Sequence, residues 1–443
     1  MKEAKRPKGP KGQKRLKGSR GACALRLLLL SLAASFAPPA AAAPGAPQEI
    51  SSWADLETAL RTNGDYILTA DVTPDNPFWA DALTVPADVT AALDLNGHTV
   101  DRGYREQGFD GSVIKIYGTL TLMDSAAGGA ITGGFPDQFG GGVQIQGGTF
   151  NLQGGIITGN SVGKTGFFGT EGLGGGVYMQ SGSFNMSGGA ITGNEALGSS
   201  MGSSLGRGGG VYITGGTFNF TGGTISGNEA GQLGGGVYLA STYSGHDGKI
   251  NVAGGATVAG NKVGGAPSNV YLEEGGVLTV DGALTGTIGV IMPTPGVFTS
   301  GLSGNGTKEN FTSDDTSYAV SLTDDGEAQL APPPPAVTDV VATPTGGSWE
   351  GMVDIAFNVA NSPAGACPDW NAPFLSIVAT DHATGSNYVA DVSALSARAP
   401  YQLAAALAGS NGTHEVTWDM GAQGIDFVST NVTFTVAYLK MPD

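Results

Sequence analysis

The chain is poor in cysteine and histidine. It has two cysteines, Cys23 and Cys367, among 443 residues, and removal of the first segment as a leader would leave Cys367 alone. No intrachain disulfide could then form. The four histidines lie in unrelated segments without the spacing of a metal site: His98, His246, His382 and His414. We therefore expect no disulfide framework, no metal and no cofactor.

Basic residues are also scarce outside the beginning of the chain. Ten of the 21 lysines and arginines lie between Lys2 and Arg26, although the formal charge of the whole chain is −17. Without residues 1–45 the chain keeps 11 basic and 37 acidic residues, a formal charge of −26. A surface this acidic repels phosphate backbones, so we expect no nucleic-acid partner.

Long apolar runs are absent. The longest, Leu27–Ala37, is shorter than the ~20 residues that cross a bilayer, so we expect no membrane span in the mature chain. A basic region precedes this run and small residues follow it at Ala40–Ala43, which is typical of a secretory signal. Cys23 precedes the run and does not suit lipid anchoring. We predict cleavage near Ala43 and a secreted or cell-surface location.

Glycine, by contrast, is abundant and belongs to a repeated unit. There are 75 glycines, without the Gly-X-Y triplets of collagen. One pattern opens with Gly-Gly-Gly-Val and closes with Gly-Asn. It occupies residues 140–160, 174–194, 208–228 and, with an insertion, 234–261. The copies start 34, 34 and 26 residues apart. This period predicts a solenoid, in which each repeat buries its apolar face against its neighbours.

Alignment of the copies places like residues in columns. Short alternating runs broken by glycine predict three strands per coil, and parallel stacking would space equivalent residues by ~4.8 Å. Paired glycines would permit positive φ at the corners. The predicted core columns are Val143, Val177, Val211, Val237 and Val270; Phe150, Phe184, Phe218 and Ile250; and Ile131, Ile157, Ile191, Ile225 and Val258.

Two further columns consist of asparagine. Turn asparagines tolerate left-handed geometry and can bond groups of the next coil, so we predict hydrogen-bonded ladders. A row that binds a ligand is the alternative. The columns are Asn160, Asn194, Asn228 and Asn261, after the corner glycines, and Asn151, Asn185, Asn219 and Asn251, after the aromatic position.

The units at Phe184-Asn185 and Gly188-Gly-Ala-Ile191 resemble the repeats of right-handed parallel β-helix proteins of the pectin-lyase-like superfamily. They are similar also to the repeats of bacterial polymorphic outer-membrane proteins, and Leu93–His98 resembles the opening coil of those proteins. The resemblance covers roughly residues 50–330 and implies a right-handed parallel β-helix. It implies little about function, because the superfamily holds lyases, hydrolases, adhesins and passenger domains.

The flanking segments complete an all-β architecture. Residues 52–61 predict a short amphipathic helix, capped by Ser52 and ended by Gly64, that covers the first coil. From Gly296 the repeat decays into a C-terminal cap. Short strands after the proline run fit an immunoglobulin-like or fibronectin-like β-sandwich. The predicted parts are a signal peptide at 1–45, the β-helix at 49–330, a linker at 331–336 and the sandwich at 337–443.

The last module has a resemblance of its own. Trp349–Ile355 and His414–Asp419 look like a module that often precedes formylglycine-generating-enzyme-like domains in bacterial surface proteins. No such enzyme domain follows in this sequence, so its chemistry is not carried over.

Carboxylates that could act in catalysis are sparse in the repeats. Lyases on this fold need an acidic calcium site and a basic Arg or Lys, and hydrolases need converging aspartates. Residues 140–261 contain only Glu171, Glu195, Glu229 and Asp247. Glu195, Glu229 and Lys262 share a column, which fits an exposed ladder with an ion pair of ~0–1 kcal/mol. The densest charged loop is interpreted as solvated and contains Arg102, Arg105, Glu106 and Asp110. No residue of the chain is assigned as catalytic.

Function is therefore expected in the irregular loops. Residues 161–173 and 196–207 are glycine-rich insertions that leave the same corner of the coil and should protrude side by side. Such loops can line a binding surface, or they can be neutral variation. We predict a non-enzymatic, adhesin-like scaffold that displays loops to a glycan or an extracellular protein. The alternative is a polysaccharide lyase or glycoside hydrolase of the same fold.

Overall fold

The computed structural model describes residues 45–77, 80–104, 111–163, 171–198, 206–240, 247–334, 336–345, 351–361, 375–390, 395–396, 411–425 and 432–438. Both cysteines and nearly all of the predicted signal peptide lie outside these residues. The chain divides after Gly45, and the elements described below belong to the part that begins at Ala46.

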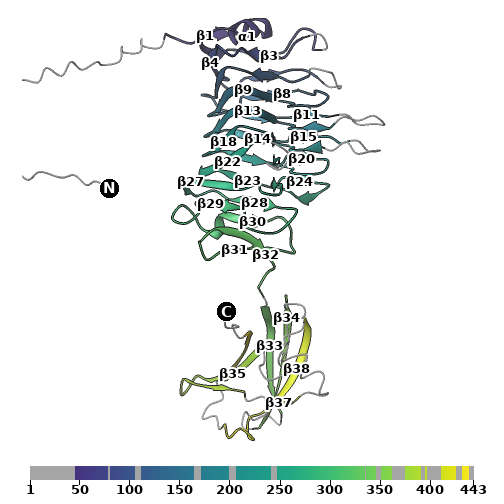
Figure 1. The fold of residues 1–443 in the computed structure, drawn as a ribbon, viewed down its shortest axis with the longest axis vertical. Helices are drawn as coiled ribbons and strands as arrows, with labels where there is room; N and C mark the ends of the chain where they lie inside the picture. The colour runs from purple at the N-terminus through teal and green to yellow at the C-terminus, as the bar shows by residue number, and fades with distance from the viewer. Residues whose placement is uncertain are drawn as a thin grey trace, which may run out of the picture. The chain divides into compact units, whose positions relative to one another are not determined.

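A parallel β-solenoid of about six turns dominates the structure (Figure 1). Each repeat contributes a strand to three sheet faces, named here in chain order. The first face contains β3 (Leu83–Val85), β6 (Ile114–Ile116), the beginnings of β9 (Val143–Leu152) and β13 (Val177–Met186), β17 (Val211–Ile213), β21 (Val237–Leu239) and β26 (Val270–Leu272).

The other two faces are stacked in the same parallel way. The second face contains β1 (Gln48–Ile50), β2 (Gly64–Leu68), β4 (Thr90–Asp94), β7 (Thr119–Met123), the ends of β9 and β13, β18 (Thr217–Phe220), β22 (Lys249–Gly254), β27 (Leu278–Leu284) and β29 (Thr299–Ser300). The third face contains β5 (Thr99–Asp101), β8 (Ala130–Thr132), β10 (Ile156–Thr158), β14 (Ala190–Thr192), β19 (Thr224–Ser226), β23 (Thr257–Ala259), β28 (Ile288–Ile291) and β30 (Phe311–Ser313).

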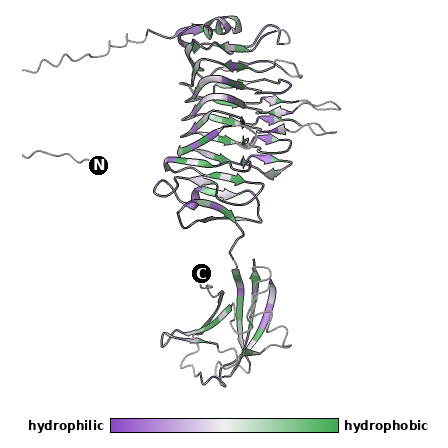
Figure 2. Cartoon of the chain, in the orientation of Figure 1, coloured by the Kyte–Doolittle hydropathy of each residue, from purple (hydrophilic) through white to green (hydrophobic). Residues whose placement is uncertain are grey.

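The predicted core columns are confirmed. Phe150 stacks on Phe184 with ring centroids 5.3 Å apart, and Phe184 stacks on Phe218 at 4.5 Å. The valine column continues to Val270 in register with Val237, and the isoleucine column continues from Ile225 to Val258. Full burial of such side chains stabilises the fold by roughly 1.5–3 kcal/mol each. Figure 2 shows the resulting alternation of hydropathy along the strands.

Glycines form the corners, as predicted. Gly182 separates the first-face and second-face halves of β13 and has a φ of 92°. A Cβ at this position would lie 2.1 Å from the carbonyl oxygen of Gly148 in the coil before. Only glycine combines this left-handed backbone with so close an approach of two coils.

Helix α1 (Trp53–Ala59) lies at the N-terminal end of the stack, and Ser52 caps it by accepting a hydrogen bond from the Asp55 N–H. Trp53 and Leu56 are buried in the solenoid core. The predicted end at Gly64 is wrong, because the helix ends at Leu60 and Gly64 opens β2. A Cβ on Gly64 would lie 2.8 Å from the Tyr66 hydroxyl, so this glycine serves close packing in the strand.

At the other end the stack closes inside the predicted bounds, where the repeat pattern decays. β29 and β30 still pair in parallel with β27 and β28, within the predicted limit at residue 330. Phe298 and Phe311 fill the core here in place of the earlier columns. A short 3-10 helix, η2 (Lys308–Asn310), precedes β30, and an antiparallel hairpin follows, formed by β31 (Ala319–Leu322) and β32 (Ala328–Ala331).

The last part of the chain forms two antiparallel sheets around a separate core. One sheet contains β33 (Ala336–Pro344), β34 (Met352–Ala360), β38 (Gly412–Asp419) and β37 (Leu395–Ser396), and the other contains β36 (Ser386–Val389), β35 (Leu375–Asp381) and β39 (Val432–Tyr438). Both sheets contribute to the core, which includes Phe357, Ile377 and the fully buried Trp418. His382 contacts the Thr433 hydroxyl at 3.0 Å, and His414 pairs in register with Phe357.

Candidate functional site

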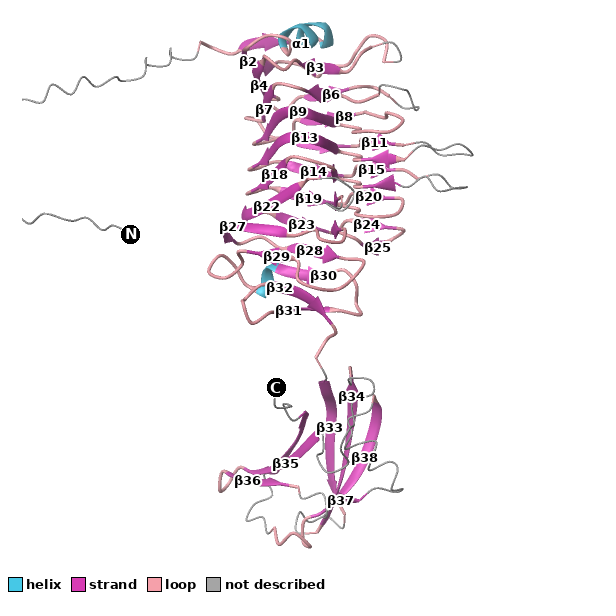
Figure 3. Cartoon of the chain, viewed as in Figure 1, coloured by secondary structure: helices cyan, strands magenta, loops and turns pink. Residues whose placement is uncertain are grey.

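The stems of the two predicted binding loops lie side by side, as expected. β11 (Ser161–Val162) pairs in parallel with β15 (Glu195–Ala196), and β12 (Gly172–Leu173) pairs with β16 (Gly206–Arg207). The first of these sheets continues into β20 (Glu229–Ala230), β24 (Lys262–Val263) and β25 (Ala266–Pro267), on one side of the stack in Figure 3. Residues 164–170 and 199–205, which hold the rest of both loops, lie outside the described residues.

A column of stacked tyrosines lies on the outside of the first face, against these stems. Tyr178, Tyr212, Tyr238 and Tyr271 follow one another in register, with centroids 5.9, 4.9 and 5.3 Å apart. Leu173 packs on the column, and the Arg207 guanidinium lies 5.5 Å from the Tyr238 ring. Burial raises the pKa of the Tyr178 hydroxyl. The Val-Tyr pairs of the repeats could have revealed this column, which attaches the stems to the solenoid.

The predicted Glu195–Glu229–Lys262 column exists, with all three residues in register. Partial burial raises the pKa of the Glu195 carboxyl, and the neighbouring Glu229 charge raises it further. The predicted ion pair is wrong, because the charged groups of Glu229 and Lys262 form no salt bridge in the described structure. Both side chains extend into water instead, where an ion pair gains little. Glu171 is likewise exposed, at the beginning of β12.

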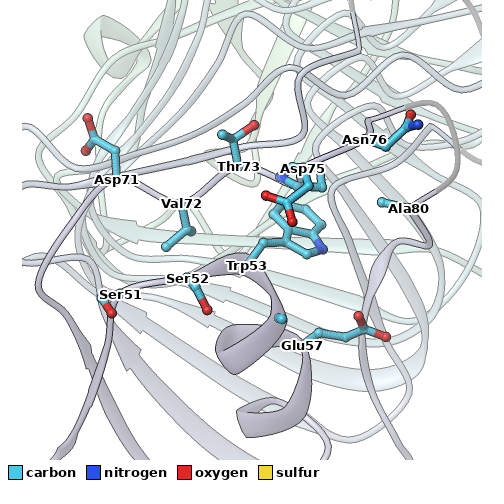
Figure 4. A pocket seen from close by; sticks show the side chains of 12 residues that line it. Ser51, Ser52, Trp53, Glu57, Asp71, Val72, Thr73, Asp75, Asn76 and Ala80 are labelled. Atoms are coloured by element: carbon cyan, nitrogen blue, oxygen red, sulfur yellow. The ribbon is translucent and has the colours of Figure 1, made fainter.

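A cavity of about 620 Å³ lies beside α1, between the helix and the segment after β2. Its lining comes from two short stretches that precede the repeat copies in the sequence. They are Ser51, Ser52, Trp53, Ala54 and Glu57, and Asp71, Val72, Thr73, Pro74, Asp75, Asn76 and Ala80. In Figure 4 Trp53 and Glu57 lie on the side of the helix, and Thr73 lies on the opposite segment with its side chain pointing away from the helix. The lining residues that the structure describes thus combine an indole, hydroxyls, an amide and three carboxylates, without a lysine or arginine among them.

Arg102 holds the far wall of this cavity in place. Its side chain is fully buried and donates hydrogen bonds from Nη1 to the Pro77 carbonyl, at 2.8 Å, and from Nη2 to the Ala80 carbonyl. Its guanidinium lies 5.7 Å from the Trp53 ring centroid and 4.8 Å from that of Tyr104. Arg102 was predicted to be solvated. That prediction is wrong, because stacking and two carbonyl acceptors replace its hydration.

The nearer wall is fixed to the third face. The Asp71 carboxylate accepts a hydrogen bond from the Thr99 N–H at 2.9 Å and lies 3.4 Å from His98 Nδ1. Val72 pairs with Val100 of β5, so Asp71 and Thr73 point outward from the same short strand segment. Asp71 and Glu57 remain open to water, with 75% and 37% of their side chains exposed.

Sequence patterns did not locate this cavity. Arg102 is the residue of the predicted charged loop that the structure describes, and it supports the cavity wall. Arg105, Glu106 and Asp110 lie outside the described residues, and so does His246. Asp247 is exposed before β22. Within the described ranges no three His, Cys, Asp or Glu side chains are arranged to hold a metal ion. Helices of the described part are too short or too polar to cross a membrane.

Comparison of the chain with family models, curated proteins and solved structures gave no match.

Proposed function

We propose that this protein is a secreted or cell-surface β-helix scaffold of the pectin-lyase-like type that binds glycans and performs no catalysis. Its C-terminal module would be an immunoglobulin-like spacer. The cavity beside α1 carries this proposal, because its hydroxyls, amide and carboxylates are groups that bind sugars. The paired loops at 161–173 and 196–207 would add contacts to a glycan or an extracellular protein.

The charge of the cavity defines the class of glycan. Among the described lining residues Glu57, Asp71 and Asp75 are acidic. Arg61 pairs with Glu57 at 3.2 Å, so the exposed Asp71 and Asp75 are the charges that disfavour an anionic sugar. Carboxylates accept two hydrogen bonds from neighbouring sugar hydroxyls, as they do from an arginine fork. The proposed ligand is therefore a neutral or amino-substituted glycan.

The three carboxylates also favour a second candidate, a glycoside hydrolase. Such enzymes place an acid and a base or nucleophile on opposite sides of the glycosidic bond. A lyase is less compatible with this cavity, because the described lining residues include no arginine or lysine to act as the base, and Arg102 behind the far wall is buried and bonded to two carbonyls.

The test is a glycan array with the protein from Ala46 to Asp443, followed by calorimetry on each sugar that binds. Glu57→Gln and Asp75→Asn should each weaken binding roughly 10-fold, because each removes a charge-assisted hydrogen bond. Asp65→Asn, at an exposed position of β2, is the matched control and should leave affinity unchanged. An array without any bound glycan would refute the proposal.

Incubation of the same sugars separates binding from hydrolysis. The scaffold should release no reducing ends over hours. Reducing ends that disappear in the Glu57→Gln or Asp75→Asn variant would replace the proposal with the hydrolase. The location is tested independently, by antibody labelling of intact cells and by analysis of the mature N-terminus, which should lie close to Ala43.

A further inference from the structure

One carboxylate of the cavity beside α1 is paired with a histidine. Asp71 lines the cavity, and its Oδ1 lies 3.4 Å from His98 Nδ1. The same oxygen accepts a hydrogen bond from the Thr99 N–H at 2.9 Å, which holds Asp71 against the beginning of β5. The side chains of His98 and Asp71 are 32% and 75% exposed, so both groups can exchange protons with water.

The backbone fixes the position of His98 in the stack. Its N–H donates to the Leu95 carbonyl at 2.8 Å, and its carbonyl accepts from the Ala130 N–H of the next coil at 3.2 Å. Asn96 and Gly97 form the tight turn before it, with φ values of 48° and 78°. These bonds involve main-chain atoms, so they hold the residue beside Asp71 in either charge state of the imidazole.

The charged groups that the structure places around this turn are acidic. Asp94 and Asp124 accept backbone N–H groups of the turn at 2.9 and 2.7 Å, from the strand before it and from the next coil. On the strand that follows, Asp101 accepts another backbone N–H at 2.7 Å. These three carboxylates are directed at main-chain donors, and Asp71 is the carboxylate that the structure pairs with the His98 imidazole.

Protonation of the imidazole changes what Asp71 offers to a sugar. Histidine is the side chain whose charge ordinarily changes between about pH 5 and 8. Beside a neutral imidazole the carboxylate keeps its charge for hydroxyl donors, and hydrogen bonds to a charged acceptor are roughly twice as strong as neutral ones. An imidazolium forms an ion pair with Asp71 instead. Because Glu57 is already paired with Arg61, Asp75 is then the carboxylate left without an ion pair among the described lining residues.

We propose that His98 makes glycan binding in the cavity depend on pH, because its neutral form leaves Asp71 free to bind a sugar and its protonated form competes for the same carboxylate. The inference rests on the proposed function, since it concerns the same cavity. It adds a direction to that function: the protein holds a neutral glycan near neutral pH and releases it more readily in acid. The competing ion pair is exposed, so the change in affinity is modest.

The test measures affinity by calorimetry from about pH 5.5 to about pH 7.5, where histidines ordinarily titrate. The probes are β-1,4-linked tetramers of glucose, mannose and N-acetylglucosamine, which are uncharged over this range. The affinity of the wild type for a tetramer that binds should be roughly 2- to 5-fold lower at the acid end. His98→Gln keeps a polar side chain that takes up no proton, so its affinity should stay constant.

Two further variants separate this pair from other effects. Asp71→Asn removes the partner, so its affinity should be lower at the upper pH and no longer change with pH. His382→Gln removes an exposed histidine of the C-terminal module and should keep the wild-type dependence. Thermal unfolding at both ends of the range should show that all variants fold.

The outcomes distinguish this inference from the proposed function. Tetramer affinity that is constant with pH in the wild type, or that still falls in His98→Gln, would overturn the inference, while the binding itself upholds the proposed function. If no tetramer and no glycan of the array binds at either pH, the proposed function fails and the inference fails with it.

Discussion

Two asparagine columns run along the solenoid, and they differ in their exposure to water and in the hydrogen bonds that they make. Asn160, Asn194, Asn228 and Asn261 are at most 1% exposed and lie inside the corner after the third face. Asn151, Asn185, Asn219 and Asn251 are half-buried on the outside of the second face. Both columns form the predicted hydrogen-bonded ladders, so the sequence interpretation is confirmed for each.

The inner ladder uses the full capacity of its amides. Asn194 Nδ2 donates to the Ile157 carbonyl at 2.9 Å, to the Thr192 carbonyl at 3.2 Å and to Asn228 Oδ1 at 2.9 Å. Each backbone N–H also donates to the Oδ1 of the next coil, as Asn194 does to Asn228 at 3.0 Å. The ladder continues through Asn269 and ends at Asp314, whose carboxylate accepts from Asn269 Nδ2 at 2.7 Å.

The outer ladder makes fewer bonds, and they run in the opposite direction. Asn185 Nδ2 donates to Asn151 Oδ1 in the coil before, at 2.8 Å, and Asn185 Oδ1 accepts from Asn219 at 2.7 Å. Water reaches this column, so a lost bond can be replaced. We therefore expect burial, and not residue type or period, to determine how much each asparagine contributes to the free energy of unfolding.

The largest effect is expected for Asn194→Ala in the inner ladder. The change removes the Nδ2 donor to the Ile157 and Thr192 carbonyls and the Oδ1 acceptor of the Asn160 backbone N–H and Nδ2. It should therefore lower the free energy of unfolding by roughly 3–5 kcal/mol. Urea denaturation monitored by circular dichroism measures the loss. A loss below that of the outer-ladder variant Asn185→Ala would contradict the distinction between the two columns.

Asp314→Asn tests the end of the inner ladder. Asn269 offers two donors here, from its backbone N–H and its Nδ2, and the carboxylate accepts both. An asparagine can present only one acceptor oxygen to them, so its NH₂ would face a donor. We expect a loss of about 1–3 kcal/mol in urea denaturation, although the side chains are nearly the same size. Asp315→Asn, at the next residue, is the control.

Asn185→Ala should have a smaller effect, of about 0.5–1 kcal/mol. It removes one donated and one accepted bond from the outer ladder, and water can satisfy the partners Asn151 and Asn219. The same denaturation measurement applies. If the loss equals that of Asn194→Ala, the outer column is as important to the fold as the inner one and exposure does not explain the contrast.

The smallest effect is expected for Glu195→Gln, in the charged column beside the ladders. Partial burial and then the Glu229 charge raise the pKa of Glu195, so the folded protein holds its proton more tightly than the unfolded chain. Wild-type stability should therefore decrease as pH rises from the ordinary glutamate value through the raised one. The variant should lose less stability over that window, as followed by melting temperature from pH 4 to 7. A steeper decrease in the variant would contradict this assignment.

Much of the solenoid could be predicted because equivalent positions of the repeat hold similar residues in several copies. Phe184 alone is ambiguous, but Phe150, Phe184 and Phe218 in equivalent positions indicate one buried column. The prediction failed where repetition stops. Gly64 is predicted as a helix end although it opens a strand, and beyond Gly296, where single residues such as Phe311 replace the columns, the pattern predicts a cap without its parallel strands.

The candidate site could not be predicted for the same reason. The cavity is formed by residues 51–57 and 71–80, two unrepeated stretches that the first coils bring together. Arg102 was identified as part of a charged loop, but its burial under Trp53 and Tyr104 depends on packing between coils. No spacing along the chain indicates such a contact.

The sequence by itself determined the stacked parallel coils, their core columns, the corner glycines and both ladders, because these features depend on periodicity and local backbone chemistry. Only the tertiary structure decided which asparagines are buried, how the inner ladder ends at Asp314, and where a cavity forms. Those outcomes depend on distances between coils and on access to water. Each arises only after segments far apart in the chain have packed together.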